Sequence, residues 1–170
     1  MRNCVVEAIV LSRASLVLRD PSHPFRWNGQ PLPDDVKVFF EQVAGGILLQ
    51  KTFDDGIAIG FELEPEALMM SINQYYGIPR GDPTFAYCDQ CFVFAHHVSD
   101  PESAWGLDLN PATSGRVFAC RIALGQHPQH EAIVVAENFT SWLHFWIDNY
   151  HTAAGDWRKL ASERQLSRLV

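Results

Sequence analysis

The sequence predicts an α+β fold in which an antiparallel strand meander packs against flanking helices. Two segments, residues 32–46 and 136–150, carry apolar side chains at helical spacing. Between them, short apolar segments alternate with turn residues at the spacing of hairpins. Helices followed by a run of strands and then by further helices are typical of α+β domains.

Length and composition favour one domain over residues 1–170. The 170-residue chain is 47% hydrophobic and 19% charged, which is ordinary for a globular protein. A chain of this size buries enough surface to fold without a disulfide or a metal. The short apolar stretch near the N-terminus is interrupted by Glu7, so we interpret it as part of the fold and expect a cytoplasmic protein without a membrane helix.

The first clear helix is predicted over residues 32–46. Residues 1–18 are apolar and fit either a helix or a pair of strands, and a turn-rich stretch follows them. Pro33 suits a first helical turn, and Asp34 and Asp35 complement the positive end of the helix dipole. Gly45 and Gly46 predict a left-handed C-cap. The apolar stripe consists of Leu32, Val36, Phe39, Phe40 and Val43.

The middle of the chain alternates between strands and turns. A strand is predicted over 57–62, and a second helix opens at Glu64 and Pro65 and stops at Gly77. Further strands are predicted at 85–88, 91–98, 104–109, 116–122 and 132–135, with turns that include 99–103 and 110–115.

Two helices are predicted after the strands. Asn138 can cap the first, which carries a large aromatic stripe and should form a main wall of the core. An extra basic helix is predicted within residues 151–170. Its apolar side chains, Trp157, Leu160 and Leu169, offer a surface for self-association into a homodimer.

Negative charge is concentrated in the middle third of the chain. Residues 52–115 hold ten acids and one base, Arg80, for a net charge of −9, whereas the whole chain carries −7. Such a block disfavours nucleic acid as a partner and favours a basic protein surface. The alternative is that these acids only keep strand edges and loops solvated. The predicted partner-binding acids cluster around one strand and its exits: Asp54, Asp55, Glu62, Glu64 and Glu66.

Candidate catalytic and metal-binding motifs are weak. Cys88 and Cys91 have the CxxC spacing of a zinc knuckle or redox pair, but they fall in a predicted hairpin. His96 and His97 are adjacent in a strand, where their side chains should point to opposite faces. The loop at 127–131 lacks the helical HExxH spacing, and the chain has no GxSxG, GxGxxG or P-loop. We therefore expect free thiols, no metal, no cofactor and no enzymatic activity.

Several motifs in order resemble one known family. They are Leu32-Pro33 with Phe39-Phe40 and Gly45-Gly46, then 105–109 (WGLDL), then 115–118 (GRVF), and the helix entry at 136–143 (AENFTSWL). Over residues 30–150 this pattern is similar to the SUKH superfamily, which includes the yeast cell-wall-assembly regulators of Smi/Knr type and many bacterial immunity proteins. The resemblance implies a non-enzymatic domain that binds another protein.

Two functions follow from this resemblance. Bacterial relatives neutralise a cognate toxin, often a nuclease, so the resemblance implies a basic toxin domain as the partner. The alternative is a regulatory or scaffold module resembling the fungal regulators of cell-wall glucan synthesis. An acidic surface suits the first function, because it can mimic phosphate and cover a basic substrate cleft.

Overall fold

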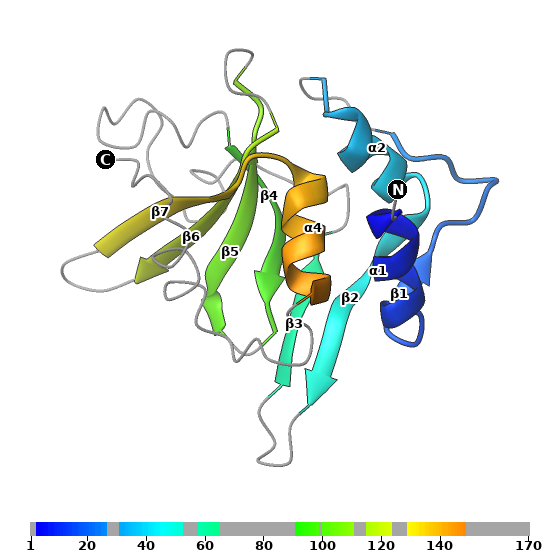
Figure 1. Cartoon of the computed structure of the whole chain (residues 1–170), viewed down its shortest axis with the longest axis horizontal. Helices are drawn as coiled ribbons and strands as arrows, with labels where there is room; N and C mark the ends of the chain where they lie inside the picture. Colours follow the sequence, from blue (N-terminus) through cyan, green and yellow to red (C-terminus); the bar gives the residue numbers. More distant parts are fainter. Residues whose placement is uncertain are drawn as a thin grey trace.

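In the described residues, the fold is built on a seven-stranded antiparallel sheet in which every strand lies beside its neighbours in sequence (Figure 1). The computed structural model describes residues 3–26, 31–52, 58–64, 91–98, 100–110, 115–123 and 129–148. The strands are β1 (Leu16–Leu18), β2 (Val43–Thr52), β3 (Ala58–Leu63), β4 (Cys91–His97), β5 (Asp100–Asp108), β6 (Val117–Ala123) and β7 (Gln129–Ala136). The predicted α+β class and antiparallel meander are confirmed.

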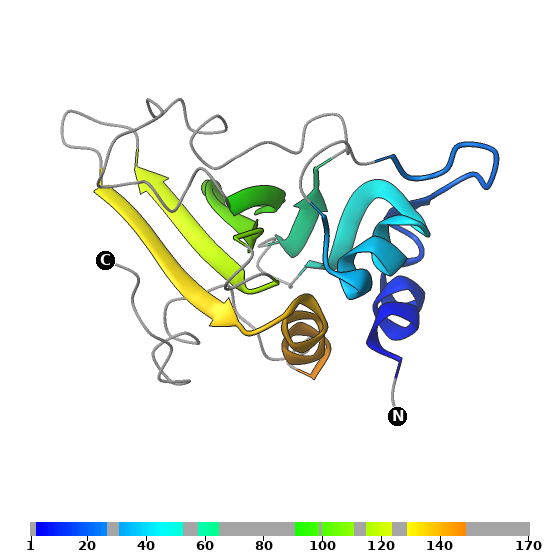
Figure 2. The same cartoon turned by 90° about the horizontal axis from the view of Figure 1, so that it is seen from above.

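Three helices occur in the described part of the chain: α1 (Cys4–Ser12), α2 (Asp34–Phe40) and α4 (Phe139–Asp148). Figure 2, which views the molecule from above, shows them along one side of a curved sheet. α1 contacts α4 and β2, and α2 contacts the same two elements. The apolar N-terminal stretch is therefore a helix followed by a short edge strand.

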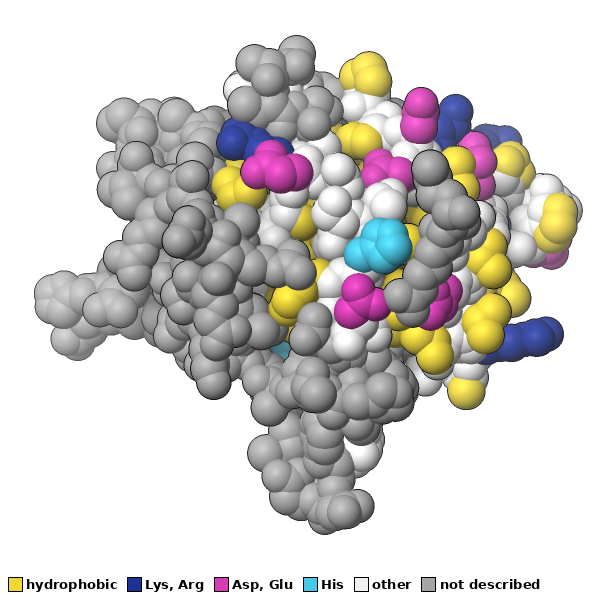
Figure 3. All heavy atoms as spheres, viewed as in Figure 1, with side chains coloured by type: hydrophobic (Ala, Val, Ile, Leu, Met, Phe, Trp, Pro, Cys, Tyr) yellow, Lys and Arg dark blue, Asp and Glu magenta, His cyan; other side chains and the backbone are white. Residues whose placement is uncertain are grey.

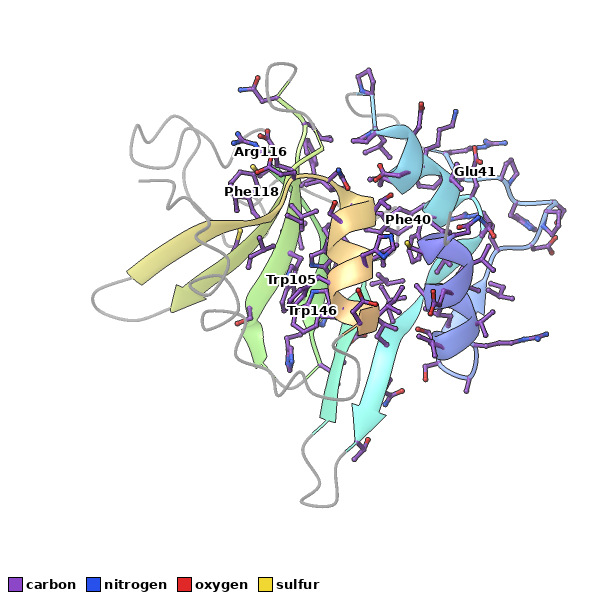
Figure 4. The ribbon with its side chains drawn as sticks, in the orientation of Figure 1. Phe40, Glu41, Trp105, Arg116, Phe118 and Trp146 are labelled. Atoms are coloured by element: carbon purple, nitrogen blue, oxygen red, sulfur yellow. The ribbon has the colours of Figure 1, made fainter. Side chains whose placement is uncertain are left out.

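Aromatic side chains hold α4 against the sheet. The Phe61 ring of β3 meets Trp105, Trp142 and Trp146, with centroid distances of 4.7, 5.0 and 4.8 Å. Trp105 and Trp146 approach each other edge to face at 6.4 Å (Figure 4). These geometries add specific stabilisation to the burial of large apolar areas. The predicted stripe of α4 is confirmed at Phe139, Trp142, Leu143, Trp146 and Ile147, which are all buried, whereas its last member, Tyr150, lies outside the described residues.

The start of α4 is fixed by two side chains. Asn138 accepts a hydrogen bond from the Ser141 N–H at 2.7 Å, as its predicted capping role requires. Asp35 of α2 accepts two more from Thr140, from the backbone N–H at 2.9 Å and from the hydroxyl at 3.0 Å. Donors that the helix cannot satisfy internally are thus satisfied from its cap and from a second helix.

The prediction that Gly45 and Gly46 cap the first helix is wrong. α2 ends at Phe40, and both glycines belong to β2, as does Val43. Gly46 has φ +97°, and a Cβ there would lie 2.4 Å from the Ser15 carbonyl oxygen. The glycine therefore permits the close approach of β1 to β2. In the local sequence, a glycine pair that this strand pairing requires looks the same as a glycine pair that caps a helix.

Two predicted turns are also corrected. β5 begins at Asp100, so most of the predicted 99–103 turn is strand, and β7 begins at Gln129, inside the predicted 127–131 loop. Pairing with β4 and with β6 extends both strands beyond their apolar segments. The predicted helix at 64–77, the strand at 85–88 and the C-terminal helix lie outside the described residues.

The sheet has a second buried face opposite the helices. Val93, Gly106, Phe118 and Val134 are paired in one row across β4–β7, and such directly opposed residues share a face. Phe118 lies apart from the core that contacts the helices, yet it is only 2% exposed. Glu62 and His96 are paired in the neighbouring row, so they share this face.

Candidate partner-binding face

Glu62, Glu64 and His96 form a charged cluster on the face of the sheet opposite the helices. Alternate residues of a strand point the same way, so Glu62 and the residue just past the end of β3, Glu64, flank His96 of β4. His96 Nε2 lies 3.2 Å from Glu62 Oε2, and its Nδ1 lies 3.1 Å from Glu64 Oε1. Each imidazole nitrogen therefore meets a carboxylate oxygen.

This geometry favours the protonated form of His96. A neutral imidazole has one N–H donor, whereas the imidazolium has two, and here both nitrogens have carboxylate acceptors. The hydrogen bond with Glu64 raises the pKa of His96 above its ordinary value of 6.5; burial opposes the rise, and the charges of Glu64 and Glu62 add to it. The cluster then carries one net negative charge instead of two.

The two acids differ in their access to a partner. The Glu62 side chain is 55% exposed, whereas the Glu64 side chain is 9% exposed and is bonded to His96. Glu62 can therefore meet a cation on another molecule, while Glu64 holds the imidazole in place. Of the other predicted partner-binding residues, Asp54, Asp55 and Glu66 lie outside the described residues.

A second acid of the negative block, Asp108, is buried and paired with an arginine of the same chain. Asp108 is 4% exposed, and its Oδ2 accepts a hydrogen bond from the Arg116 guanidinium at 3.2 Å. Its Oδ1 accepts from the Asn110 N–H at 2.9 Å. The Arg116 guanidinium also lies 5.8 Å from the centre of the Phe118 ring (Figure 4). The net negative charge counted from the sequence is therefore larger than the charge that this part of the block exposes to solvent.

The described part of the chain places some of the candidate metal and redox residues. The side chains of Cys4, Cys91 and Cys120 are buried, and Cys88 lies outside the described residues. His97 lies against Phe61 and Trp105 while His96 meets the glutamates, so the predicted opposite orientation is confirmed. Within the described ranges, no three His, Cys, Asp or Glu side chains are placed to hold a metal ion.

The role of His96 in this cluster was missed by sequence reasoning. In the sequence, Glu62 and Glu64 are separated by one residue, and the adjacent His96 and His97 lie in a later predicted strand. Those patterns become a cluster only when β3 and β4 are paired with Glu62 opposite His96. An alternating acid pair beside a strand histidine is the signal that could have suggested it.

Comparisons with known proteins add no relative: no family model, no curated protein and no solved structure matches the chain. Among the helices of the described residues, none has the length and apolar character needed to cross a membrane.

Proposed function

We propose that this protein is a non-enzymatic, cytoplasmic binding protein that neutralises a basic toxin domain by covering its surface. The observation that carries the proposal is the exposed Glu62 carboxylate within a sequence block of ten acids and one base. Such a block attracts a cationic partner from a distance and orients it during encounter. The resemblance to immunity proteins of the SUKH superfamily supports the same function.

The cluster is suited to recognition by charge and shape. Because Glu64 is buried against His96, the position of the imidazole beside Glu62 is fixed before a partner arrives. Preorganised groups lose less conformational entropy on binding than mobile ones do. We therefore assign Glu62 to partner contact, and Glu64 with His96 to positioning.

The test is a binding titration with the protein encoded beside this gene, which the proposal expects to be basic. We expect a complex whose affinity falls as the salt concentration rises from about 50 mM to about 500 mM, because salt screens exposed charges. Failure to form a complex at the lower salt concentration contradicts the proposal. A complex indifferent to salt contradicts its electrostatic part.

The regulatory alternative predicts a different partner. The resemblance at Leu32-Pro33, Phe39-Phe40 and the α4 entry is shared with the cell-wall-assembly regulators as well. If this function holds, the neighbouring gene encodes no toxin, and the protein that co-purifies is a component of cell-wall synthesis. Identification of the co-purified protein by mass spectrometry separates the two functions.

A further inference from the structure

The exposed acid proposed for partner contact already lies beside a cation of its own chain. Nε2 of His96 is 3.2 Å from Oε2 of Glu62, so a protonated His96 holds a positive charge against this carboxylate. A cation of another molecule that binds Glu62 must share the carboxylate with the imidazolium. Because two cations at one carboxylate repel each other, the protonated and neutral forms of His96 differ in their affinity for a cationic partner.

The two glutamates beside His96 are not equivalent acceptors. The Glu64 side chain is 9% exposed, whereas the Glu62 side chain is 55% exposed. A neutral imidazole donates one hydrogen bond instead of two, and an acceptor left without a donor costs more free energy when it is buried than when water reaches it. Loss of one proton should therefore leave the Nδ1–H of His96 with Glu64 and remove the donor from Glu62.

The groups that face His96 come from the two strands beside β4. From β3 they are the two glutamates, and on β5 the residue paired with His96 is Ala104, which has no charge. His97, the next residue of β4, points to the opposite face of the sheet. The side chains of two further acids of β5, Asp100 and Glu102, lie outside the described ones. Among the described side chains, the two glutamates are therefore the charges that act on His96.

We propose that a cationic group of the partner replaces the His96 imidazolium at Glu62, so that binding releases a proton from His96 to solvent. This proton coupling rests on the partner-binding function proposed above. The proton leaves Nε2, which then faces Glu62 without a hydrogen, while the Nδ1–H remains with Glu64. When binding releases a proton, linkage requires that the partner binds more tightly as the pH rises.

The pH range of this effect follows from the free protein. The hydrogen bond with Glu64 keeps the pKa of His96 above its ordinary value of 6.5, against the opposing effect of burial. The free protein therefore still carries the proton at about pH 6 and has lost it at about pH 9. Affinity for a cation at Glu62 should rise between these two pH values.

A short cationic peptide tests the coupling without the toxin. Hexalysine with an acetylated N-terminus and an amidated C-terminus keeps its ammonium charges in this range, because the lysine pKa is about 10.4. At low salt, its affinity for the wild type, measured by fluorescence anisotropy, should rise about fivefold or more from about pH 6 to about pH 9. Hexalysine should also lower the pH at which the His96 ring loses its proton, followed by NMR of its carbon-bound protons.

Substitutions separate His96 from the other groups that titrate. His96→Gln keeps a neutral side chain beside Glu62, so it should remove most of the pH dependence and bind hexalysine at about pH 6 nearly as tightly as at about pH 9. His23→Gln is the matched control, because the His23 side chain is 83% exposed and lies outside the cluster, and it should keep the pH dependence of the wild type.

A second pair of variants tests the position of the bound cation. Glu62→Gln should weaken hexalysine binding and remove most of its pH dependence. Glu41→Gln, at an exposed glutamate of the helix side, should keep both. Figure 3 shows that side of the molecule, where acidic side chains lie close to Lys and Arg side chains.

Four results would overturn the coupling. They are equal affinity of the wild type for hexalysine at the two pH values, tighter binding at the lower pH, equal pH dependence in the wild type and His96→Gln, and no binding at either pH. If His96→Gln does not fold, the NMR titration of the wild type decides, and an unchanged His96 midpoint with hexalysine overturns the coupling. The toxin titration remains separate, because absence of a toxin complex contradicts the proposed function and not the hexalysine result.

Discussion

Asp35 joins two helices that are far apart in sequence. Its Oδ1 accepts from the Val36 N–H at 2.9 Å, and its Oδ2 accepts both hydrogen bonds from Thr140. One carboxylate thus caps the first turn of α4 while it lies in the first turn of α2, where negative charge also complements the helix dipole.

Substitution of Asp35 by alanine should lower the free energy of unfolding by about 1–2 kcal/mol, the usual cost of losing a helix cap. Asp34→Ala is the matched control, because Asp34 lies in the same first turn but is exposed. Urea denaturation of both variants measures the difference. Equal losses of unfolding free energy from the two substitutions would mean that the hydrogen bonds to Thr140 add no stability beyond the interaction of a carboxylate with the dipole of α2.

Arg116 and Asp108 form the second residue-scale feature that can be tested. Replacing Arg116 with glutamine leaves a nearly buried carboxylate without its charged hydrogen-bond donor, and we expect a loss of about 1–3 kcal/mol in unfolding free energy. Arg13→Gln, at an exposed arginine, should change stability little at low protein concentration. Thermal unfolding of the two variants measures the difference. Similar melting temperatures would contradict a stabilising role for the ion pair between Arg116 and Asp108.

The pairing of β3 with β4 determines the protonation of His96, and this gives a pH dependence. The folded pKa is raised above 6.5, so the stabilisation is complete below that pH and is lost as the pH rises through the folded pKa. The unfolding free energy of the wild type should exceed that of His96→Gln by more at about pH 6 than at about pH 9.

Chemical denaturation at both pH values measures this difference, and His23→Gln provides the control. The His23 side chain is 83% exposed, so its loss should leave the pH dependence of the wild type intact. A constant gap between wild type and His96→Gln at the two pH values would refute the raised pKa.

Elements specified by local sequence were predicted well, whereas features that depend on pairing were not. The stripe and the Asn138 cap of α4 are local, and the structure has both. The end of α2 was misplaced because a glycine pair has the same local signature in a helix cap and in a strand crowded by a neighbour. β5 and β7 extend past their apolar segments because each hydrogen-bonds to a partner strand.

The same holds for the candidate site: its acids could be identified from the local sequence, but contacts with residues far along the chain could not. The sequence predicted Glu62 and Glu64 alike as partner-binding acids, but it could not separate an exposed carboxylate from a buried one. That distinction comes from His96, which lies 32 residues beyond Glu64 in the chain. The bond between Asp35 and Thr140 spans 105 residues, and no local pattern indicates it.

At the scale of the whole molecule, the two faces of the sheet carry different kinds of side chain. The helix side holds the aromatic core around Phe61, and the other side carries the Glu62, Glu64 and His96 cluster. Substitutions on the helix side that keep the fold intact should therefore leave the binding proposed for Glu62 unchanged.

Charge reversal at one exposed glutamate tests the central claim most directly. The measurement is the affinity of Glu62→Lys and Glu41→Lys for the protein encoded beside the gene, by calorimetry at low salt. Glu41 is an exposed glutamate at the end of α2, on the helix side of the molecule (Figure 4). We predict that Glu62→Lys weakens binding about tenfold or more and that Glu41→Lys changes it by less than about threefold. Equal affinities for the two variants would contradict the assignment of Glu62 to the partner-binding face.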